Sequence, residues 1–338
     1  MRISKALPIL VLLSLVAGLL AGCQGENTAQ AIPDKVTLQL QWVTQAQFAG
    51  YYVALDKGWY LEENIELAII PGGPDLVPVD LVMSGTRDFG TGLLADLAMA
   101  IEVGKPVISI AQVQQNNGLM LVVHKDSGIA GPADFAGKRV GVWLGSWEAQ
   151  FDAMIAQAGL SLNDFELVAQ GYSMDPFLNR ELDVASAMVY NEYQSILESG
   201  VSANDLTIID YANYGLSFPG DTLFTSRTIA EQNPSLCVRM LRATLRGWQY
   251  AVENPEEAAE IVLKYDQSGT QTRGHQVAMM KEIARLVSVS GIEMGYTDPA
   301  SVQLMVDTLV QYGVLNQAVD INQVFTNQFW EQVQNSGK

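Results

Sequence analysis

This sequence contains little cysteine, little histidine and few positive charges. Its 338 residues include two Cys and two His, and 19 Lys and Arg stand against 37 Asp and Glu, for a formal net charge of −18. Two cysteines cannot build a disulfide framework, and a Cys/His zinc site needs about four such ligands close together. We therefore expect no metal site. An acidic surface repels phosphate backbones, so we also expect no nucleic-acid partner. Because 49% of the residues are hydrophobic, the chain can form globular cores, and its length suggests two domains.

The apolar run at the N-terminus is too short for a permanent membrane span. It covers residues 7–20 and follows two positively charged residues. A helix needs about 20 apolar residues to cross the hydrocarbon of a bilayer. A run of this length behind positive charges is instead typical of a signal peptide.

The end of this run carries the motif Leu20-Ala21-Gly22-Cys23. The motif resembles the bacterial lipobox, which implies that residues 1–22 are a signal peptide and that Cys23 carries a lipid. Two or more acyl chains hold a protein stably on a membrane. We therefore expect residues 23–34 to be a tether and the protein to lie on the extracytoplasmic face of the cell membrane. A secretory signal that happens to contain a cysteine is the alternative.

Strand-like and helical patterns alternate along the first two thirds of the chain. Val36–Trp42 alternates apolar and polar residues as a strand does, Phe48–Asp56 is predicted to be a helix, and Ile65–Ile70 is predicted to be the next strand. The same alternation continues beyond residue 126. It indicates an α/β fold with largely parallel sheets.

Asp221–Ser226 is predicted to be a strand that returns to the first unit, and the chain beyond it is mostly helical. We therefore expect two α/β lobes joined by two crossover segments. Lobe I would comprise residues 35–124 and 222–338, and lobe II residues 125–221. Ligands of such folds bind at the carboxyl ends of the strands and between domains.

Several separate motifs follow one another in a definite order along the chain. They are Trp42-Val43-Thr44-Gln45-Ala46-Gln47-Phe48-Ala49-Gly50-Tyr51-Tyr52, Lys57-Gly58-Trp59-Tyr60-Leu61-Glu62-Glu63, Pro71-Gly72-Gly73, Ser84-Gly85-Thr86-Arg87-Asp88-Phe89-Gly90 and Gly137-Lys138-Arg139-Val140-Gly141-Val142. Over residues 36–250 this order resembles the family of thiamin-pyrimidine-synthase-like and sulfonate-binding-protein-like solute-binding proteins. The resemblance implies a type II periplasmic-binding-protein fold. It also implies work as a monomer with the permease and ATPase of an ABC importer.

Members of this family bind thiamin pyrimidine precursors, riboflavin, sulfonates or nitrate, and one branch makes the thiamin pyrimidine. Phe48 stands where the pyrimidine-binding branch often has His, and the cysteine-rich iron motif of the synthases is missing. We therefore expect a binding protein without catalytic residues or cofactor, and we favour riboflavin as its ligand. A thiamin pyrimidine precursor, a sulfonate- or nitrate-type solute, a synthase-like enzyme and a sensor ectodomain remain alternatives.

The loops expected at the cleft contain many aromatic and amide side chains but no Lys or Arg. They span residues 42–52, 71–75, 90–96, 112–118, 143–148, 172–177 and 190–193. Anionic ligands are usually held by Arg, Lys or helix N-termini. The loops therefore favour a neutral planar ligand, stacked on aromatic rings and hydrogen-bonded along its edge by carboxylate and amide groups.

Ten residues of these loops are our candidate ligand contacts. They are Trp42, Gln45, Phe48, Tyr51, Asp96, Gln114, Trp143, Tyr190, Asn191 and Glu192. Trp42, at the end of its predicted strand, would face the cleft unless it is a core tryptophan. Asp96 has a helix cap as its alternative. For Glu192 the resemblance implies contact with the ligand ring, because the corresponding Glu has this role in the pyrimidine-binding branch. A solvated loop acid is the alternative there.

Overall fold

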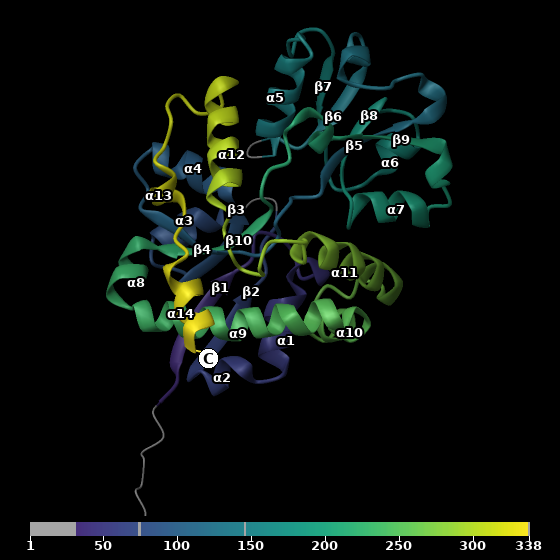
Figure 1. Cartoon of the computed structure of the whole chain (residues 1–338). Helices are drawn as coiled ribbons and strands as arrows, with labels where there is room; N and C mark the ends of the chain where they lie inside the picture. Colours follow the sequence, from purple (N-terminus) through teal and green to yellow (C-terminus); the bar gives the residue numbers. More distant parts are fainter. Residues whose placement is uncertain (1–31, 74–75, 145–146, 337–338) are drawn as a thin grey trace, which may run out of the picture. The chain divides into compact units, whose positions relative to one another are not determined.

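The computed structural model describes residues 32–73, 76–144 and 147–336 (Figure 1). The predicted signal peptide, Cys23 and most of the predicted tether lie outside the described residues. Asp34–Lys338 forms a compact unit of its own. Among the described residues, no helix combines the length and the apolar character that crossing a membrane requires.

Within the described residues, the strands form two five-stranded sheets. The first sheet has the order β2-β1-β3-β10-β4, with β1 at Asp34–Gln39, β2 at Ile65–Ile70, β3 at Phe89–Leu93, β4 at Val107–Gln112 and β10 at Asp221–Ser226. The second has the order β7-β6-β8-β5-β9, with β5 at Leu119–His124, β6 at Arg139–Val142, β7 at Glu166–Ala169, β8 at Val184–Met188 and β9 at Leu206–Asp210. The predicted α/β class is confirmed.

The two sheets have equivalent topologies, and the first one takes its strand β10 from the part of the chain that follows the second. In both, the fourth strand of the order is antiparallel to its two neighbours, β10 in the first sheet and β5 in the second. β10 follows β9 in the chain but pairs with β3 and β4, as the sequence predicted for a returning strand.

The placement of Leu119–His124 in lobe I was wrong, because this strand belongs to the second sheet. This strand pairs with β8 and β9, beginning with Leu119 opposite Met188. The first crossover therefore lies before β5, in residues 113–118, and the second in residues 211–220. A strand that is apolar on both faces does not reveal its partners in the sequence, because either sheet would bury it equally well.

Helices of eight or more residues pack around the two sheets (Figure 1). They are α1 (Ala49–Asp56), α4 (Leu94–Glu102), α5 (Glu148–Gln157), α9 (Pro234–Glu253), α10 (Pro255–Tyr265), α11 (Arg273–Val287), α12 (Pro299–Gln311) and α14 (Gln328–Ser336). The shorter ones are α2 (Trp59–Glu62), α3 (Pro78–Met83), α6 (Asp175–Leu178), α7 (Glu192–Glu198), α8 (Arg227–Gln232) and α13 (Ile321–Val324).

α1 and α9 cross in direct backbone contact. A Cβ atom on Gly247 of α9 would lie 2.0 Å from the carbonyl oxygen of Gly50 on α1, and a Cβ on Gly50 would lie 2.2 Å from the Trp248 ring. Only glycine permits this approach. The ring of Tyr51 packs edge-on against Trp248 at 5.6 Å, and both side chains are buried.

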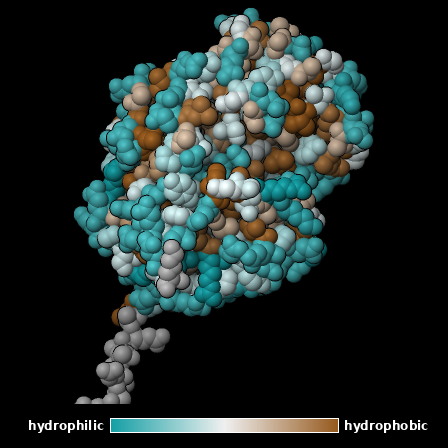
Figure 2. Space-filling view, in the orientation of Figure 1, coloured by the Kyte–Doolittle hydropathy of each residue, from teal (hydrophilic) through white to brown (hydrophobic). Residues whose placement is uncertain are grey.

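The outer side of α9 carries three arginines, and each of them forms an ion pair with a carboxylate. Arg239 contacts Asp34, Arg242 contacts Glu63 and Arg246 contacts Glu62. Figure 2 shows mostly hydrophilic residues over this part of the molecule. The amphipathic pattern of the sequence therefore corresponds to one face of α9 in the core and the other in solvent.

Candidate ligand-binding site

A cavity of about 630 Å³ is built from the carboxyl ends of strands of both sheets. The first sheet contributes Gln41 and Trp42 after β1, and Thr91 within β3. The second contributes Trp143 after β6 and Tyr190 after β8. The volume lies within the range of small-molecule sites. The expected location at the carboxyl ends of the strands is confirmed.

Trp42 leaves the first sheet earlier than the sequence predicted. β1 ends at Gln39, and the backbone N–H of Gln41 donates to the side-chain hydroxyl of Thr91 in β3 at 2.9 Å rather than to a backbone carbonyl of that strand. The ring of Trp42 then lies 4.9 Å from that of Tyr172, at an interplanar angle of 62°. Trp143 and Trp147, which also line the cavity, are 6.4 Å apart. The cavity is therefore bordered by aromatic rings from both sheets.

On the first-sheet side, two glutamines donate to one buried carboxylate and a third glutamine donates to one of these two. Asp221, the first residue of β10, accepts hydrogen bonds from Gln41 Nε2 at 2.7 Å and from Gln47 Nε2 at 2.8 Å. Gln45 Nε2 in turn donates to Gln47 Oε1 at 2.7 Å. All three glutamines line the cavity, whereas Asp221 is buried behind them.

Burial raises the pKa of Asp221 to about 7. The hydrogen bonds from Gln47 and Gln41 act in the opposite direction, because they stabilise the charged form, and the nearby Asp96 raises the pKa further. A carboxyl group that titrates near neutral pH therefore lies directly behind the wall of the cavity.

A second buried carboxylate, Glu192, lies on the second-sheet side. Its Oε2 accepts from the backbone N–H of Met188 at 3.0 Å, and its Oε1 accepts from Asn191 Nδ2 at 2.6 Å. Burial raises the pKa of Glu192, and these hydrogen bonds oppose that effect. Each carboxylate oxygen keeps a second lone pair with which it can accept a hydrogen bond from a ligand.

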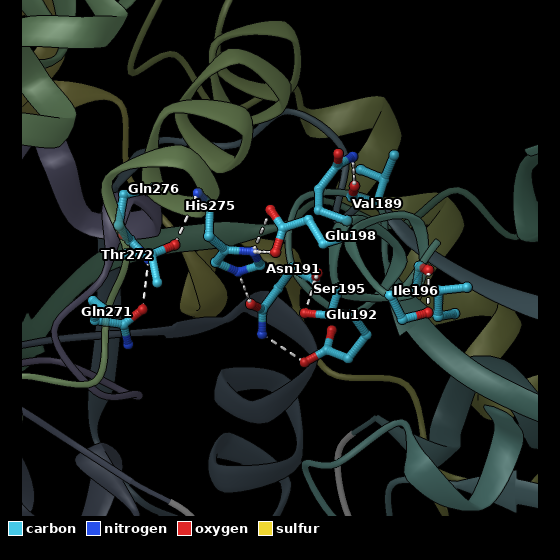
Figure 3. A network of polar contacts seen from close by, with 12 residues as sticks. Val189, Asn191, Glu192, Ser195, Ile196, Glu198, Gln271, Thr272, His275 and Gln276 are labelled. Atoms are coloured by element: carbon cyan, nitrogen blue, oxygen red, sulfur yellow. Dashed lines mark hydrogen bonds and ion pairs between the residues drawn. The ribbon is translucent and has the colours of Figure 1, made fainter. Parts of the chain in front are cut away.

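A histidine from α11 completes this group (Figure 3). His275 Nε2 lies 2.8 Å from Asn191 Oδ1, and its Nδ1 lies 3.1 Å from Glu198 Oε2 on α7. The Asn191 amide is oriented by its donation to Glu192, so both ring nitrogens face oxygen acceptors. The ring can donate to both only when it carries both protons. His275 thus links the helical tail to the second-sheet side of the cavity.

The sequence matches the model of the NMT1/THI5 like family over residues 45–258. The chain belongs to the NMT1/THI5-like family. Two curated relatives are a 4-amino-5-hydroxymethyl-2-methylpyrimidine phosphate synthase of Legionella pneumophila and the riboflavin-binding protein RibY of Chloroflexus aurantiacus. The first is 30% identical over 69% of this chain and 74% of its own length. The second is 27% identical over 89% of this chain and 87% of its own length.

Solved structures agree with the fold of this NMT1/THI5-like chain. The periplasmic aliphatic sulphonate binding protein SsuA of Escherichia coli superposes with a TM-score of 0.69, covering 86% of this chain and 91% of its own. Its sequence is 14% identical. The periplasmic-binding-protein fold expected from the sequence is therefore confirmed.

Seven of the ten candidate contacts line the cavity of the NMT1/THI5-like fold. They are Trp42, Gln45, Asp96, Trp143, Tyr190, Asn191 and Glu192. Asp96 lines the cavity and also has the helix-cap contact that was its alternative, since its carboxylate accepts from the backbone N–H of Leu93 at the start of α4. That these seven residues contact a ligand stays a prediction.

Phe48, Tyr51 and Gln114 do not line the cavity, and their placement there was wrong. Phe48 and Tyr51 belong to the core, because the short turn Ala46–Phe48 and helix α1 direct them inward against the helical tail. Gln114 is fully buried in the first crossover, where its backbone N–H and carbonyl are bonded to Asp221 and Gly220. A loop position in the sequence does not show which side of the loop faces the cleft.

One basic residue lies in the cavity wall, although the loops expected at the cleft contain no Lys or Arg. Lys105, which follows α4, is among the lining residues, and its ammonium group pairs with Asp80 Oδ1 at 2.6 Å. The positive charge is therefore matched by a neighbouring carboxylate.

Sequence reasoning missed Gln41, Asp221 and His275. A sequence signal existed for Asp221, which is an acidic residue at the head of an otherwise apolar or hydroxylic strand. Gln41 continues the alternation of β1 beyond the strand itself. His275 lies 84 residues from Asn191 in the chain, so no local pattern connects the two.

Proposed function

We propose that this protein is the solute-binding lipoprotein of an ABC importer and captures a neutral heteroaromatic vitamin or vitamin precursor. Riboflavin is the favoured ligand, and a thiamin pyrimidine precursor is the alternative. In this proposal Cys23 carries the lipid anchor on the extracytoplasmic face. A permease and an ATPase are the partners of the monomeric protein.

The observation that carries the proposal is the pairing of aromatic walls with hydrogen-bond acceptors in one cavity. The rings of Trp42 and Trp143 come from different sheets, and offset or edge contacts between rings contribute about 0.5–1.5 kcal/mol each. Glu192 and the glutamine amides offer acceptors to the N–H and O–H groups of a planar solute. A relative named as riboflavin-binding that aligns over 89% of this chain supports the same ligand class.

We further propose that the units built on the two sheets act as lobes that close over the ligand. The Trp42–Tyr172 contact and the His275–Asn191 hydrogen bond each join residues of the two sides. A ligand that touches both sides would favour the closed form, and the importer would recognise that form.

The test is a ligand titration of purified protein lacking residues 1–23. Riboflavin binding is measured by quenching of flavin fluorescence, and 4-amino-5-hydroxymethyl-2-methylpyrimidine binding by the shift in melting temperature. Trp42→Ala should weaken riboflavin binding about 30-fold, since both stacking and apolar burial are lost. The matched control is Trp59→Ala, because Trp59 packs on Tyr250 away from the cavity.

Quenching that persists in the control and fades in Trp42→Ala supports a stacked flavin. A melting temperature that rises with the pyrimidine alone assigns the protein to the precursor branch. If neither compound binds but ethanesulfonate does, the heteroaromatic assignment is rejected.

An enzymatic function is the second candidate, because the Legionella pneumophila relative is named a synthase. Among the described residues, the cavity lining contains no Cys or His, which favours binding over nucleophilic catalysis. Recovery of the bound compound unchanged, by mass spectrometry after prolonged incubation, supports a binding protein. Its conversion to a new product supports the enzyme.

A further inference from the structure

The hydrogen bonds around Asp221 determine which atoms the glutamines present to the cavity. An ionised carboxylate only accepts hydrogen bonds, so Gln41 and Gln47 must both turn their Nε2 groups toward it. Gln47 then presents its Oε1 to Gln45, and the Nε2 group of Gln45 donates to this oxygen. Each amide orientation is thus a consequence of one buried charge.

The oxygens left over are those of Gln41 and Gln45. Neither accepts a hydrogen bond from another described residue, and both side chains line the cavity. Gln41 Oε1 lies 3.9 Å from the position of a Cβ atom on Gly92, another lining residue. The first-sheet side of the cavity therefore offers two acceptor oxygens, those of Gln41 and Gln45.

We infer that Asp221 is a specificity-determining positioning residue that makes this side of the cavity accept hydrogen bonds, and thereby selects neutral, donor-bearing solutes over anions. The inference rests on the proposed function and names the chemical feature of the ligand that the site reads. Because Asp221 does not touch the cavity, it acts through the glutamines alone.

Replacement of Asp221 by asparagine should turn over the side-chain amide of at least one glutamine. The new amide would offer one oxygen and one NH₂ group to two glutamine NH₂ groups, so one glutamine must turn over to avoid facing donor with donor. If Gln41 turns, its NH₂ group faces the cavity. If Gln47 turns, Gln45 must turn as well, and the NH₂ group of Gln45 faces the cavity. In either case one acceptor becomes a donor.

The test compares three variants with wild type, using riboflavin and 4-amino-5-hydroxymethyl-2-methylpyrimidine as neutral probes and ethanesulfonate as the anionic probe. Asp221→Asn should lower the affinity for the neutral probe that wild type binds, by roughly tenfold to a hundredfold, since a glutamine NH₂ group then faces a donor of the ligand. Asp88→Asn is the control, because Asp88 holds Thr37 on the same sheet without lining the cavity.

The decisive variant is the double exchange Gln41→Glu with Asp221→Asn. It moves the negative charge from position 221 to position 41. The introduced glutamate accepts a hydrogen bond from the introduced asparagine amide and still presents an oxygen to the cavity. We expect it to recover most of the affinity lost in Asp221→Asn. A merely structural role for Asp221 predicts no such recovery, so a double variant no better than the single one would overturn the inference.

The pH profile gives a second readout. Burial raises the pKa of Asp221 to about 7, and the other titratable groups that influence it or are influenced by it are Asp96 on α4, Tyr51 on α1 and Tyr190 after β8. A protonated Asp221 becomes a donor and turns one amide, as asparagine does. Affinity for the neutral probe should therefore fall as the pH falls through about 7, and this dependence should vanish in Asp221→Asn. If Asp221→Asn does not fold, a flat wild-type profile overturns the inference.

A ligand-free measurement separates failure of this inference from failure of the proposed function. With ¹⁵N-labelled glutamine, the side-chain amide resonances of Gln41, Gln45 and Gln47 should shift in Asp221→Asn and stay in place in Asp88→Asn. If wild type binds neither neutral probe, the proposed function fails while these resonances still test the orientation of the amides. Unchanged resonances, or preference of wild type for ethanesulfonate, overturn the inference.

Discussion

On the first-sheet side of the cavity, the amides of Gln41, Gln45 and Gln47 are supported by buried Asp221, and every member of this group belongs to the first sheet or its loops. On the second-sheet side the acceptor is the carboxylate of Glu192, and its partner Asn191 is held by His275 from the helical tail. The two sheets have equivalent topologies. Equal topology therefore supports two different arrangements, one self-contained and one that depends on contact between the two sides.

This difference suggests a division of roles. A self-contained group keeps its orientation whether the cavity is open or closed, which suits the recognition of ligand chemistry. A group that includes a residue from the opposite side is complete only when the sides meet, which suits the coupling of ligand binding to closure. The following predictions test this comparison in order of expected effect.

The largest effect concerns the stability of the first-sheet group. Because the pKa of Asp221 is raised in the folded protein to about 7, the folded state keeps a proton that the unfolded state releases above about pH 4. The contribution of Asp221 to the free energy of unfolding should therefore decrease by roughly 2–4 kcal/mol as the pH rises from about 4 to about 7. Urea denaturation across this interval should show a smaller decrease in Asp221→Asn, and equal slopes would contradict the prediction.

The next effect concerns the carboxylate of the second-sheet group. Glu192→Gln keeps the shape but removes a charged acceptor, so affinity for a donor-bearing neutral ligand should fall about 50-fold, as expected for a hydrogen bond to a charged group. Titration by calorimetry measures this, with Glu181→Gln, an exposed residue, as the control. An unchanged affinity would place recognition on the first-sheet side alone.

A smaller effect is expected for the link between the sides. His275→Ala removes the contacts with Asn191 and Glu198 without altering the cavity lining. Affinity should fall about fivefold, mainly through faster dissociation, because closure is weakened while the ligand contacts remain. Stopped-flow measurement of both rate constants checks this, and a slower association with unchanged dissociation would reject it.

The smallest effect is expected for the basic residue at the rim. The charge of Lys105 is matched by Asp80, and surface ion pairs contribute about 0–1 kcal/mol. Lys105→Ala should therefore change the affinity for a neutral ligand by less than about twofold. A large loss in the same titration would indicate an anionic ligand and weaken the comparison between the two acceptor groups.

Much of the fold could be predicted from local patterns. The return of Asp221–Ser226 to the first sheet, the helical tail and the position of the cavity at the strand ends are confirmed. The partners of Leu119–His124 could not be predicted, because burial on both faces leaves no polar residue to mark an edge. The end of β1 was also placed too late, since the hydroxyl of Thr91, 50 residues away, satisfies the Gln41 N–H.

The candidate site divides in the same way. Tryptophans and acids at strand ends, such as Trp42, Trp143 and Glu192, were found from the sequence because strand ends converge at one edge of a sheet. Phe48 and Tyr51 were misplaced, because the rotation of α1 depends on its glycine contact with α9.

By itself, the sequence determined the alternation of strands and helices, the acidic charge and the supply of aromatic and amide side chains near the cleft. Only the tertiary structure decided which of these side chains meet. Asp221 lies 174 residues from Gln47, and His275 lies 84 from Asn191. Hydrogen bonds act over about 3 Å, so such partners are defined by the folding of distant segments against one another and not by any pattern along the chain.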